Sequence, residues 1–144
     1  MKIYADENMP LVAEFFGHLG PVTLFNGRTV QASELADAQI LLVRSVTTVD
    51  QSLLAGNKIL RFVGMATIGM DHIDQRYLSE RGVSFSSAPG CNAQSVLEYV
   101  LSALWYLADK YQWQLSSKTL GIVGVGNIGQ RLAKAAAALN ITVL

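Results

Sequence analysis

The chain has 144 residues, of which 51% are hydrophobic, and its eleven basic residues balance its eleven acidic ones. This hydrophobic content supports a folded core and excludes a disordered or fibrous chain. The lack of a basic excess argues against nucleic-acid or anionic-membrane partners, because binding to such surfaces depends on displacing counterions.

The first part of the chain alternates short apolar runs with helical patterns. Strands are predicted at Lys2–Ala5, Val22–Phe25, Ile40–Val43, Phe62–Val63 and Val83–Ser86. Helices are predicted at Pro10–Leu19, Asp50–Leu54 and Asp74–Arg81, with a short turn near Ser33–Asp37 and helix stops at Gly20 and Gly82. This alternation predicts a parallel sheet that is covered on both faces.

The pattern changes after Pro89-Gly90. We expect a long helix at Asn92–Tyr111, a strand at Thr119–Val123, a helix from Ile128 to about Leu139, and another strand from Ile141. Residues 1–91 and 92–144 are therefore predicted to belong to separate domains. A dinucleotide-binding fold needs more than one βαβ unit, so we also expect this chain to be the N-terminal part of a longer protein.

A glycine loop joins the last predicted strand–helix pair and forms the strongest motif of the chain. Its sequence runs from Gly124 to Gly129, with Gly126 between them, and it matches G-x-G-x-x-G. Glycine at these positions permits a tight turn, close approach of a pyrophosphate and close helix–strand packing, while amides near Asn127 and Ile128 would face the phosphates. The alternative is a glycine-rich turn that binds no ligand.

Polar side chains follow two predicted strands. Arg44-Ser45 comes after Ile40–Val43, and Thr67 comes shortly after Phe62–Val63. Because ligands of parallel sheets bind beyond the carboxyl ends of the strands, Arg44, Ser45 and Thr67 are candidate substrate-binding residues. The alternative is a surface arginine with ordinary loop hydroxyls. Asp6-Glu7-Asn8 occupies a similar place, but we expect it to begin the first helix.

The remaining reactive residues favour structural roles. His18 is expected on a solvated helix surface, and His72 in a turn where Asp71 or Asp74 caps the next helix. With two histidines and one cysteine, Cys91, a metal site and an internal disulfide are not expected. The single cysteine and the absence of a signal peptide predict a cytoplasmic protein.

Taken together, these segments resemble the D-isomer-specific 2-hydroxyacid dehydrogenases. The matching segments are Val43-Arg44-Ser45, Val63–Asp74, Asn92-Ala93 with Val96 and Glu98, and Leu120–Gly129. Two further segments, Ala5–Pro10 and Ser87–Ala93, are similar to members that act on a small phosphorylated hydroxyacid.

The resemblance implies a flavodoxin-like substrate domain followed by the start of a Rossmann NAD-binding domain. It also implies NAD as the cofactor, oxidation of a phosphorylated hydroxyacid, and a homodimer. Ser45 and Thr67 would contact the substrate with Arg44 adjacent, and residues 126–129 would hold the pyrophosphate. The catalytic Arg, Glu and His of the family follow the glycine loop, so no catalytic residue is assigned within this chain. Another 2-hydroxyacid substrate, or a non-enzymatic NAD-sensing corepressor, remains an alternative.

Overall fold

The computed structural model describes all 144 residues and divides into two compact units, residues 1–88 and 89–144. The division falls at the Pro89-Gly90 break that the sequence pattern indicated. Each unit has its own hydrophobic core, so the two are described separately.

The first unit is built on a five-stranded parallel sheet. Its strands are β1 (Ile3–Asp6), β2 (Val22–Phe25), β3 (Ile40–Val43), β4 (Phe62–Met65) and β5 (Ser84–Ser86). They lie in the order β2-β1-β3-β4-β5, and every neighbouring pair is parallel. This is the strand order of flavodoxin-like folds, and it confirms the predicted fold class of this unit.

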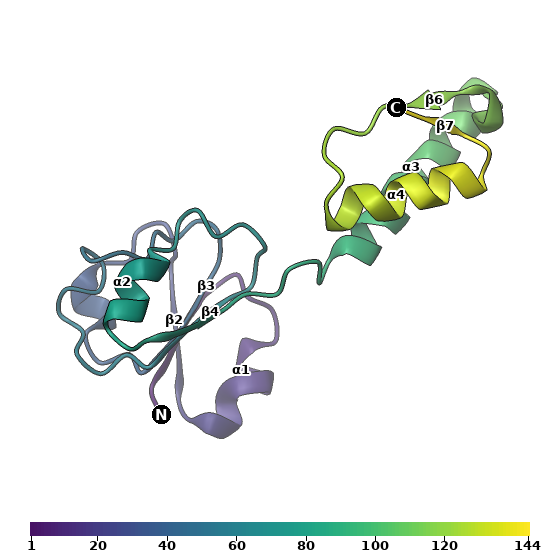
Figure 1. Ribbon diagram of the computed structural model, residues 1–144. Helices are drawn as coiled ribbons and strands as arrows, with labels where there is room; N and C mark the ends of the chain where they lie inside the picture. The colour runs from purple at the N-terminus through teal and green to yellow at the C-terminus, as the bar shows by residue number, and fades with distance from the viewer. The chain divides into compact units, whose positions relative to one another are not determined.

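Both faces of the sheet are covered, as the alternation of strands and helices predicted. Leu41 and Val43 of β3 point to one face and pack with Leu78 of α2 (Gln75–Glu80). Ile40 and Leu42 point to the other face, where Val12 of α1 (Val12–Phe16) packs. Figure 1 shows α1 and α2 on opposite sides of the sheet.

Local signals set the bounds of the short helices. The carboxylate of Asp74 caps α2 by accepting a hydrogen bond from the amide of Tyr77 at 2.9 Å, and Gly82 follows the helix with a φ of 67°. The helix predicted at Pro10–Leu19 is α1 followed by a 3-10 turn (Gly17–Leu19), and the turn near Ser33–Asp37 is a 3-10 helix (Ala32–Leu35).

Two predicted helical features of this unit are wrong. Residues 50–54 form turns, because the Asp50 carboxylate accepts hydrogen bonds from the Leu53 amide and the Ser52 hydroxyl and so closes a local loop. Asp6-Glu7-Asn8 does not begin the first helix. Asp6 is the last residue of β1, and α1 begins at Val12 after Leu11, which has a left-handed φ of 59°.

The second unit is a single βαβ unit preceded by a long helix. Its elements are α3 (Ala93–Tyr111), a 3-10 helix (Leu115–Ser117), β6 (Thr119–Leu120), α4 (Asn127–Ala138) and β7 (Thr142–Val143). Its core contains Ala108 of α3 and Ala136 of α4. This arrangement confirms the predicted start of a Rossmann domain.

Strand β6 is shorter than the predicted strand Thr119–Val123. It pairs only with β7. Beyond the two strands, the Ile122 amide donates one further hydrogen bond to the Leu144 carbonyl at 2.8 Å. Val123 has no neighbouring strand and is fully exposed. In neither unit does a helix combine the length and apolar character needed to cross a membrane.

Candidate functional site

The candidate substrate-binding residues lie together at one edge of the sheet. Because β1, β3 and β4 are adjacent and parallel, their carboxyl ends share that edge. Val43 is paired with Met65, and the Ala66 amide donates a hydrogen bond to the Val43 carbonyl at 3.0 Å. The segments that carry Arg44-Ser45 and Thr67 are therefore neighbours.

Arg44 is held by a carboxylate at the end of the neighbouring strand. Its guanidinium Nη1 lies 3.6 Å from Oδ1 of Asp6, whose side chain is completely buried. The same Oδ1 accepts a hydrogen bond from the Asn8 amide at 2.8 Å. Both contacts are made by Oδ1, whereas Oδ2 of Asp6 is buried and has no hydrogen-bond partner within the chain. The Arg44 side chain is about one-third exposed, so it can also reach a ligand.

The two candidate hydroxyls differ in their surroundings. Ser45 is exposed at the edge. The Oγ1 atom of Thr67 is buried and has no hydrogen-bond partner within the chain. A buried hydroxyl without a partner is unfavourable, and such groups are commonly satisfied by a bound molecule.

Sequence reasoning missed Asp6 as part of this site. The position of Asp6 directly after a predicted strand was the available signal, but the following Asn8 and Pro10 also fit a helix start. The salt bridge to Arg44 decides between these interpretations. It depends on the strand order, which places β1 beside β3.

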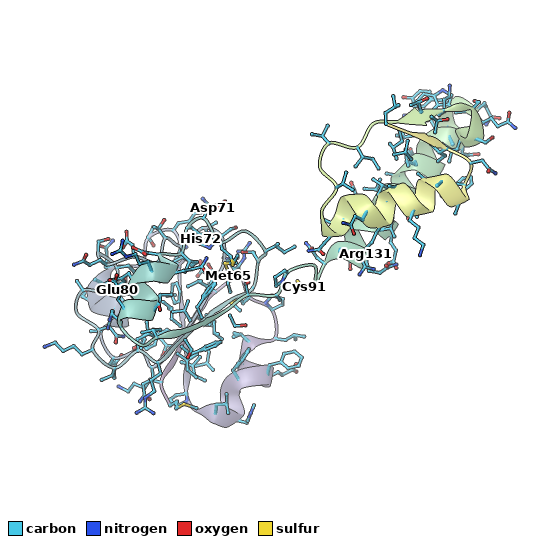
Figure 2. All side chains as sticks on the ribbon, in the orientation of Figure 1. Met65, Asp71, His72, Glu80, Cys91 and Arg131 are labelled. Atoms are coloured by element: carbon cyan, nitrogen blue, oxygen red, sulfur yellow. The ribbon has the colours of Figure 1, made fainter.

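The histidines lie outside this cluster. His18 is exposed in the 3-10 turn after α1. His72 lies beside Asp71 on the loop before α2 (Figure 2), where its carbonyl accepts a hydrogen bond from the Val49 amide at 2.8 Å. Cys91 is exposed on the segment that leads from β5 into α3 (Figure 2). No three His, Cys, Asp or Glu residues are grouped so that they could hold a metal ion.

In the second unit, the glycine loop leads directly into the N-terminus of α4. Gly124 has a φ of 95°, which a residue with a side chain rarely adopts. Gly126 precedes α4 as its N-cap, and no side chain caps the helix. The amides of Asn127 and Ile128 therefore stand in the first turn, where they have no partner within the helix.

The other two glycines of the motif differ in what surrounds them. A Cβ atom on Gly126 would meet nothing within 4 Å, so space for a ligand lies next to the backbone. A Cβ atom on Gly129 would lie 2.1 Å from the Gly124 carbonyl oxygen. Gly129 thus permits the close packing of α4 on the loop, while Gly126 leaves the approach to the helix N-terminus open.

A parallel α/β unit followed by a glycine-loop βαβ unit is an arrangement found in dinucleotide-binding folds. The family model described as D-isomer specific 2-hydroxyacid dehydrogenase, catalytic domain, matches residues 3–143 of the sequence. The chain belongs to this family.

Curated relatives narrow the likeness to one kind of enzyme. The chain is 54% identical over 143 residues to the erythronate-4-phosphate dehydrogenase of Tolumonas auensis, and 54% identical over 144 residues to that of Escherichia coli O7:K1. It spans 38% of the length of each of these proteins, and they cover 99% and 100% of the chain. The narrower likeness predicted from Ala5–Pro10 and Ser87–Ala93 is thereby confirmed.

Solved structures match the fold at low sequence identity. The TT0316 protein of Thermus thermophilus has a TM-score of 0.80 at 22% identity, covering 99% of this chain and 55% of its own. The NAD+-bound 3-phosphoglycerate dehydrogenase of Entamoeba histolytica has a TM-score of 0.75 at 21% identity, covering 99% and 52%.

Proposed function

We propose that the protein containing this chain oxidises 4-phospho-D-erythronate to its 2-oxo acid with NAD, as a step in the formation of pyridoxal phosphate. The observation that carries the proposal is 54% identity, over essentially the whole chain, to relatives named erythronate-4-phosphate dehydrogenase. The polar edge of the first unit and the glycine loop of the second supply the two kinds of binding site that this reaction requires.

On the substrate side, Ser45 and Thr67 bind the hydroxyacid and Arg44 attracts its negative charge. The unpartnered Oγ1 of Thr67 supports this role, because a substrate oxygen would give that buried hydroxyl the partner it lacks. The ion pair with Asp6 supports the role of Arg44, since it fixes the guanidinium at the strand edge. These three residues orient the substrate and do not transfer its proton.

On the cofactor side, Gly124, Gly126, Asn127, Ile128 and Gly129 hold the pyrophosphate of NAD. The open space at Gly126 and the uncapped N-terminus of α4 support this assignment, because backbone amides there present partial positive charge to an anion. When bound, NAD supplies the acceptor for the hydride that leaves the substrate's C2 atom.

The chain alone is expected to be inactive. The family resemblance places the Arg, Glu and His that polarise the substrate and accept its proton after the glycine loop, and none is assigned here. Residues 1–91 would form the N-terminal portion of the substrate domain, and residues 92–144 the beginning of the NAD domain. A cytoplasmic homodimer completes the proposal. The exposed aromatic side chains Tyr99, Trp105 and Tyr106 of α3 favour self-association.

The direct test is formation of reduced nicotinamide by the full-length protein, supplied with 4-phospho-D-erythronate, NAD and an acceptor that draws off the product. The expected result is absorbance from reduced NAD that depends on the substrate. Signal only with a different 2-hydroxyacid would overturn the substrate. The absence of signal with every 2-hydroxyacid would favour the NAD-sensing alternative.

A variant of Thr67 tests whether the residues at the carboxyl ends of the strands bind the substrate. Thr67→Val removes one hydroxyl with little change in shape, and it should raise KM by about threefold to tenfold, the range for one neutral hydrogen bond. Thr67→Ser keeps the hydroxyl and should retain most of the affinity. A wild-type KM in Thr67→Val would remove Thr67 from the proposed site.

A further inference from the structure

Arg28 is a positively charged residue that has no role in the binding sites described so far. It lies on the loop after β2, is exposed, and takes part in none of the three ion pairs of the chain, which are Lys2–Asp37, Arg44–Asp6 and Arg76–Glu80. Its backbone is nevertheless fixed, because the Arg28 amide donates to Oδ1 of Asn26 at 3.0 Å. The guanidinium therefore projects from an ordered turn.

This turn borders a small cavity at the same sheet edge as Arg44. The cavity has a volume of about 230 Å³ and is lined by Asp6, Asn8, Asn26, Gly27, Arg28, Arg44 and Val46. We call it the Arg28 cavity. Its size suits a single small group rather than a whole nucleotide. Two arginines and one aspartate are among the residues that line it, so the lining carries a net positive charge.

Gly27, which lines the Arg28 cavity, is closely surrounded by other residues. A Cβ atom on Gly27 would lie 2.2 Å from Oδ2 of Asp6 and 2.5 Å from Oγ1 of Thr47, so only glycine fits between them. The Thr47 hydroxyl donates a hydrogen bond to the Gly27 carbonyl at 3.0 Å. Asp6 is buried beside Gly27 and forms the ion pair with Arg44. Asp6 is therefore a positioning residue for that guanidinium.

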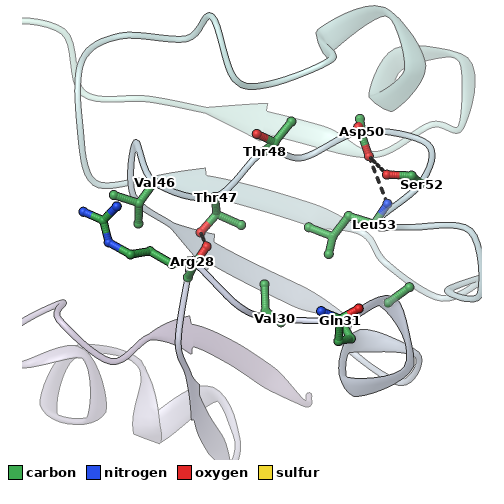
Figure 3. Close-up of a pocket in the computed structure, with 11 residues that line it drawn as sticks. Arg28, Val30, Gln31, Val46, Thr47, Thr48, Asp50, Ser52 and Leu53 are labelled. Carbon is green, nitrogen blue, oxygen red and sulfur yellow. Dashed lines mark hydrogen bonds between the residues drawn. The ribbon is translucent and has the colours of Figure 1, made fainter.

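A larger neighbouring cavity of about 410 Å³ shares Gly27, Arg28 and Val46 with the first (Figure 3). Its one carboxylate, Asp50, already accepts hydrogen bonds from the Ser52 hydroxyl and the Leu53 amide. Those two donors also lower the pKa of Asp50, the amide of Leu53 more than the hydroxyl. In Figure 3 the Arg28 side chain extends toward Val46 and away from Asp50.

We propose that the Arg28 cavity is the subsite for the phosphate group of the substrate. Arg28 and Arg44 bind the phosphate oxygens through charge-assisted hydrogen bonds, and Asp6 keeps Arg44 in place. Ser45, adjacent to Arg44 in the chain, and Thr67 on the neighbouring strand end contact the hydroxyacid part. Arg28 thereby selects phosphorylated over unphosphorylated hydroxyacids. This assignment rests on the proposed function for the identity of the substrate.

The first test is independent of the reaction and uses the 144-residue chain with inorganic phosphate as the probe. Amide NMR signals of Asn8, Gly27 and Arg28 should shift saturably with phosphate, but not with chloride at matched ionic strength. Arg28→Gln should abolish the shifts. Arg61→Gln removes the same charge from an exposed arginine at the opposite end of the sheet and should retain them. No saturable shift in the wild-type chain, or shifts that persist in Arg28→Gln, would overturn the proposal.

The second test uses the full-length enzyme and compares the KM for 4-phospho-D-erythronate with the inhibition constant of D-erythronate, which lacks the phosphate. Arg28→Gln should raise this KM by about tenfold or more, the scale of a charge-assisted hydrogen bond, and leave kcat and the inhibition constant nearly unchanged. Arg28→Lys should recover part of the affinity. Equal weakening of both ligands would refute a phosphate-specific role. Phosphate binding without oxidation of 4-phospho-D-erythronate would refute the proposed function but keep the anion site.

Discussion

Gly126 and Gly129 belong to one motif, yet the structure gives them opposite sensitivities to an added methyl group. Gly129→Ala would place Cβ 2.1 Å from the Gly124 carbonyl oxygen, which is backbone and cannot rotate away. We expect this variant to lose about 1–3 kcal/mol of unfolding free energy, the usual range for overpacking. Urea unfolding followed by tryptophan fluorescence measures it, because Trp105 and Trp113 both lie in the second unit.

Gly126→Ala is the matched control. Gly126 has a φ of −84°, which alanine adopts freely, and its Cβ would meet nothing within 4 Å. Because alanine is a poorer N-cap than glycine, its unfolding midpoint should fall slightly, and by less than that of Gly129→Ala. Equal destabilisation by both substitutions would contradict the division of roles between packing and ligand approach.

At the same scale, the sequence predicted some of the candidate site residues and missed others for identifiable reasons. Arg44 and Thr67 were predicted because each follows an apolar run, and the carboxyl ends of parallel strands gather at one edge. Asp6 was misread, since an acidic residue before Asn8 and Pro10 also fits a helix start. Arg28 carries no motif at all, and only the pairing of β1 with both β2 and β3 brings its turn beside Arg44.

Among the elements, β1 is tied to the segment before β3 by a polar cluster of Lys2, Tyr4 and Asp37. The Tyr4 hydroxyl donates a hydrogen bond to Oδ1 of Asp37 at 2.6 Å, and Lys2 forms an ion pair with Oδ2. Hydrogen bonding by Lys2 and then by Tyr4 lowers the pKa of Asp37 below its ordinary value of 3.8. The hydrogen bond to Asp37 in turn raises the pKa values of Lys2 and Tyr4.

These shifts fix how the cluster affects stability as pH changes. A carboxyl group whose pKa is lower in the folded state stabilises the fold above its unfolded value and loses that effect as pH falls through the folded value. Asp37→Asn should therefore lower the melting temperature at neutral pH and flatten its fall below pH 3.8. Thermal unfolding across the acid range measures this.

Asp71→Asn provides the comparison, because Asp71 is an exposed carboxylate outside the cluster. Its melting profile should follow that of the wild-type chain. An Asp37→Asn profile that runs parallel to wild type throughout the acid range would show that the cluster contributes nothing through Asp37.

Whether a predicted element matched the structure depended on what decides its bounds. The predicted bounds of β2 and β3 agree with the structure, because apolar runs flanked by proline or polar residues define them. Residues 50–54 look helical by composition, but the Asp50 side chain closes a turn there. The strand predicted at Thr119–Val123 was too long, since strand length depends on a partner and β7 pairs only with Thr119 and Leu120.

For the molecule as a whole, the class of fold was more predictable than its spatial order. Alternating strands and helices require a parallel sheet, and the strand order β2-β1-β3-β4-β5 is one of the few orders that such sheets adopt. The two hydrophobic clusters of the first unit follow from fully apolar strands such as β3, whose four residues are all buried. The pairing of β1 with β3 was not readable from local patterns.

The two units should also differ in stability. The first unit has a hydrophobic cluster on each face of a five-stranded sheet, whereas the core of the second has four buried residues, Ala108, Leu115, Ala136 and Ile141, beside a two-stranded sheet. A sheet of two strands with a small apolar core is only marginally stable. We therefore expect the second unit to unfold at a lower urea concentration than the first.

Tryptophan fluorescence reports the second unit, which contains both tryptophans, and the amide NMR signals of Leu41 and Val63 report the core of the first. The fluorescence midpoint should come first, with the amide signals of the sheet persisting at that urea concentration. Coincident midpoints would indicate one cooperative transition and contradict the expectation, because two-state unfolding requires all probes to agree.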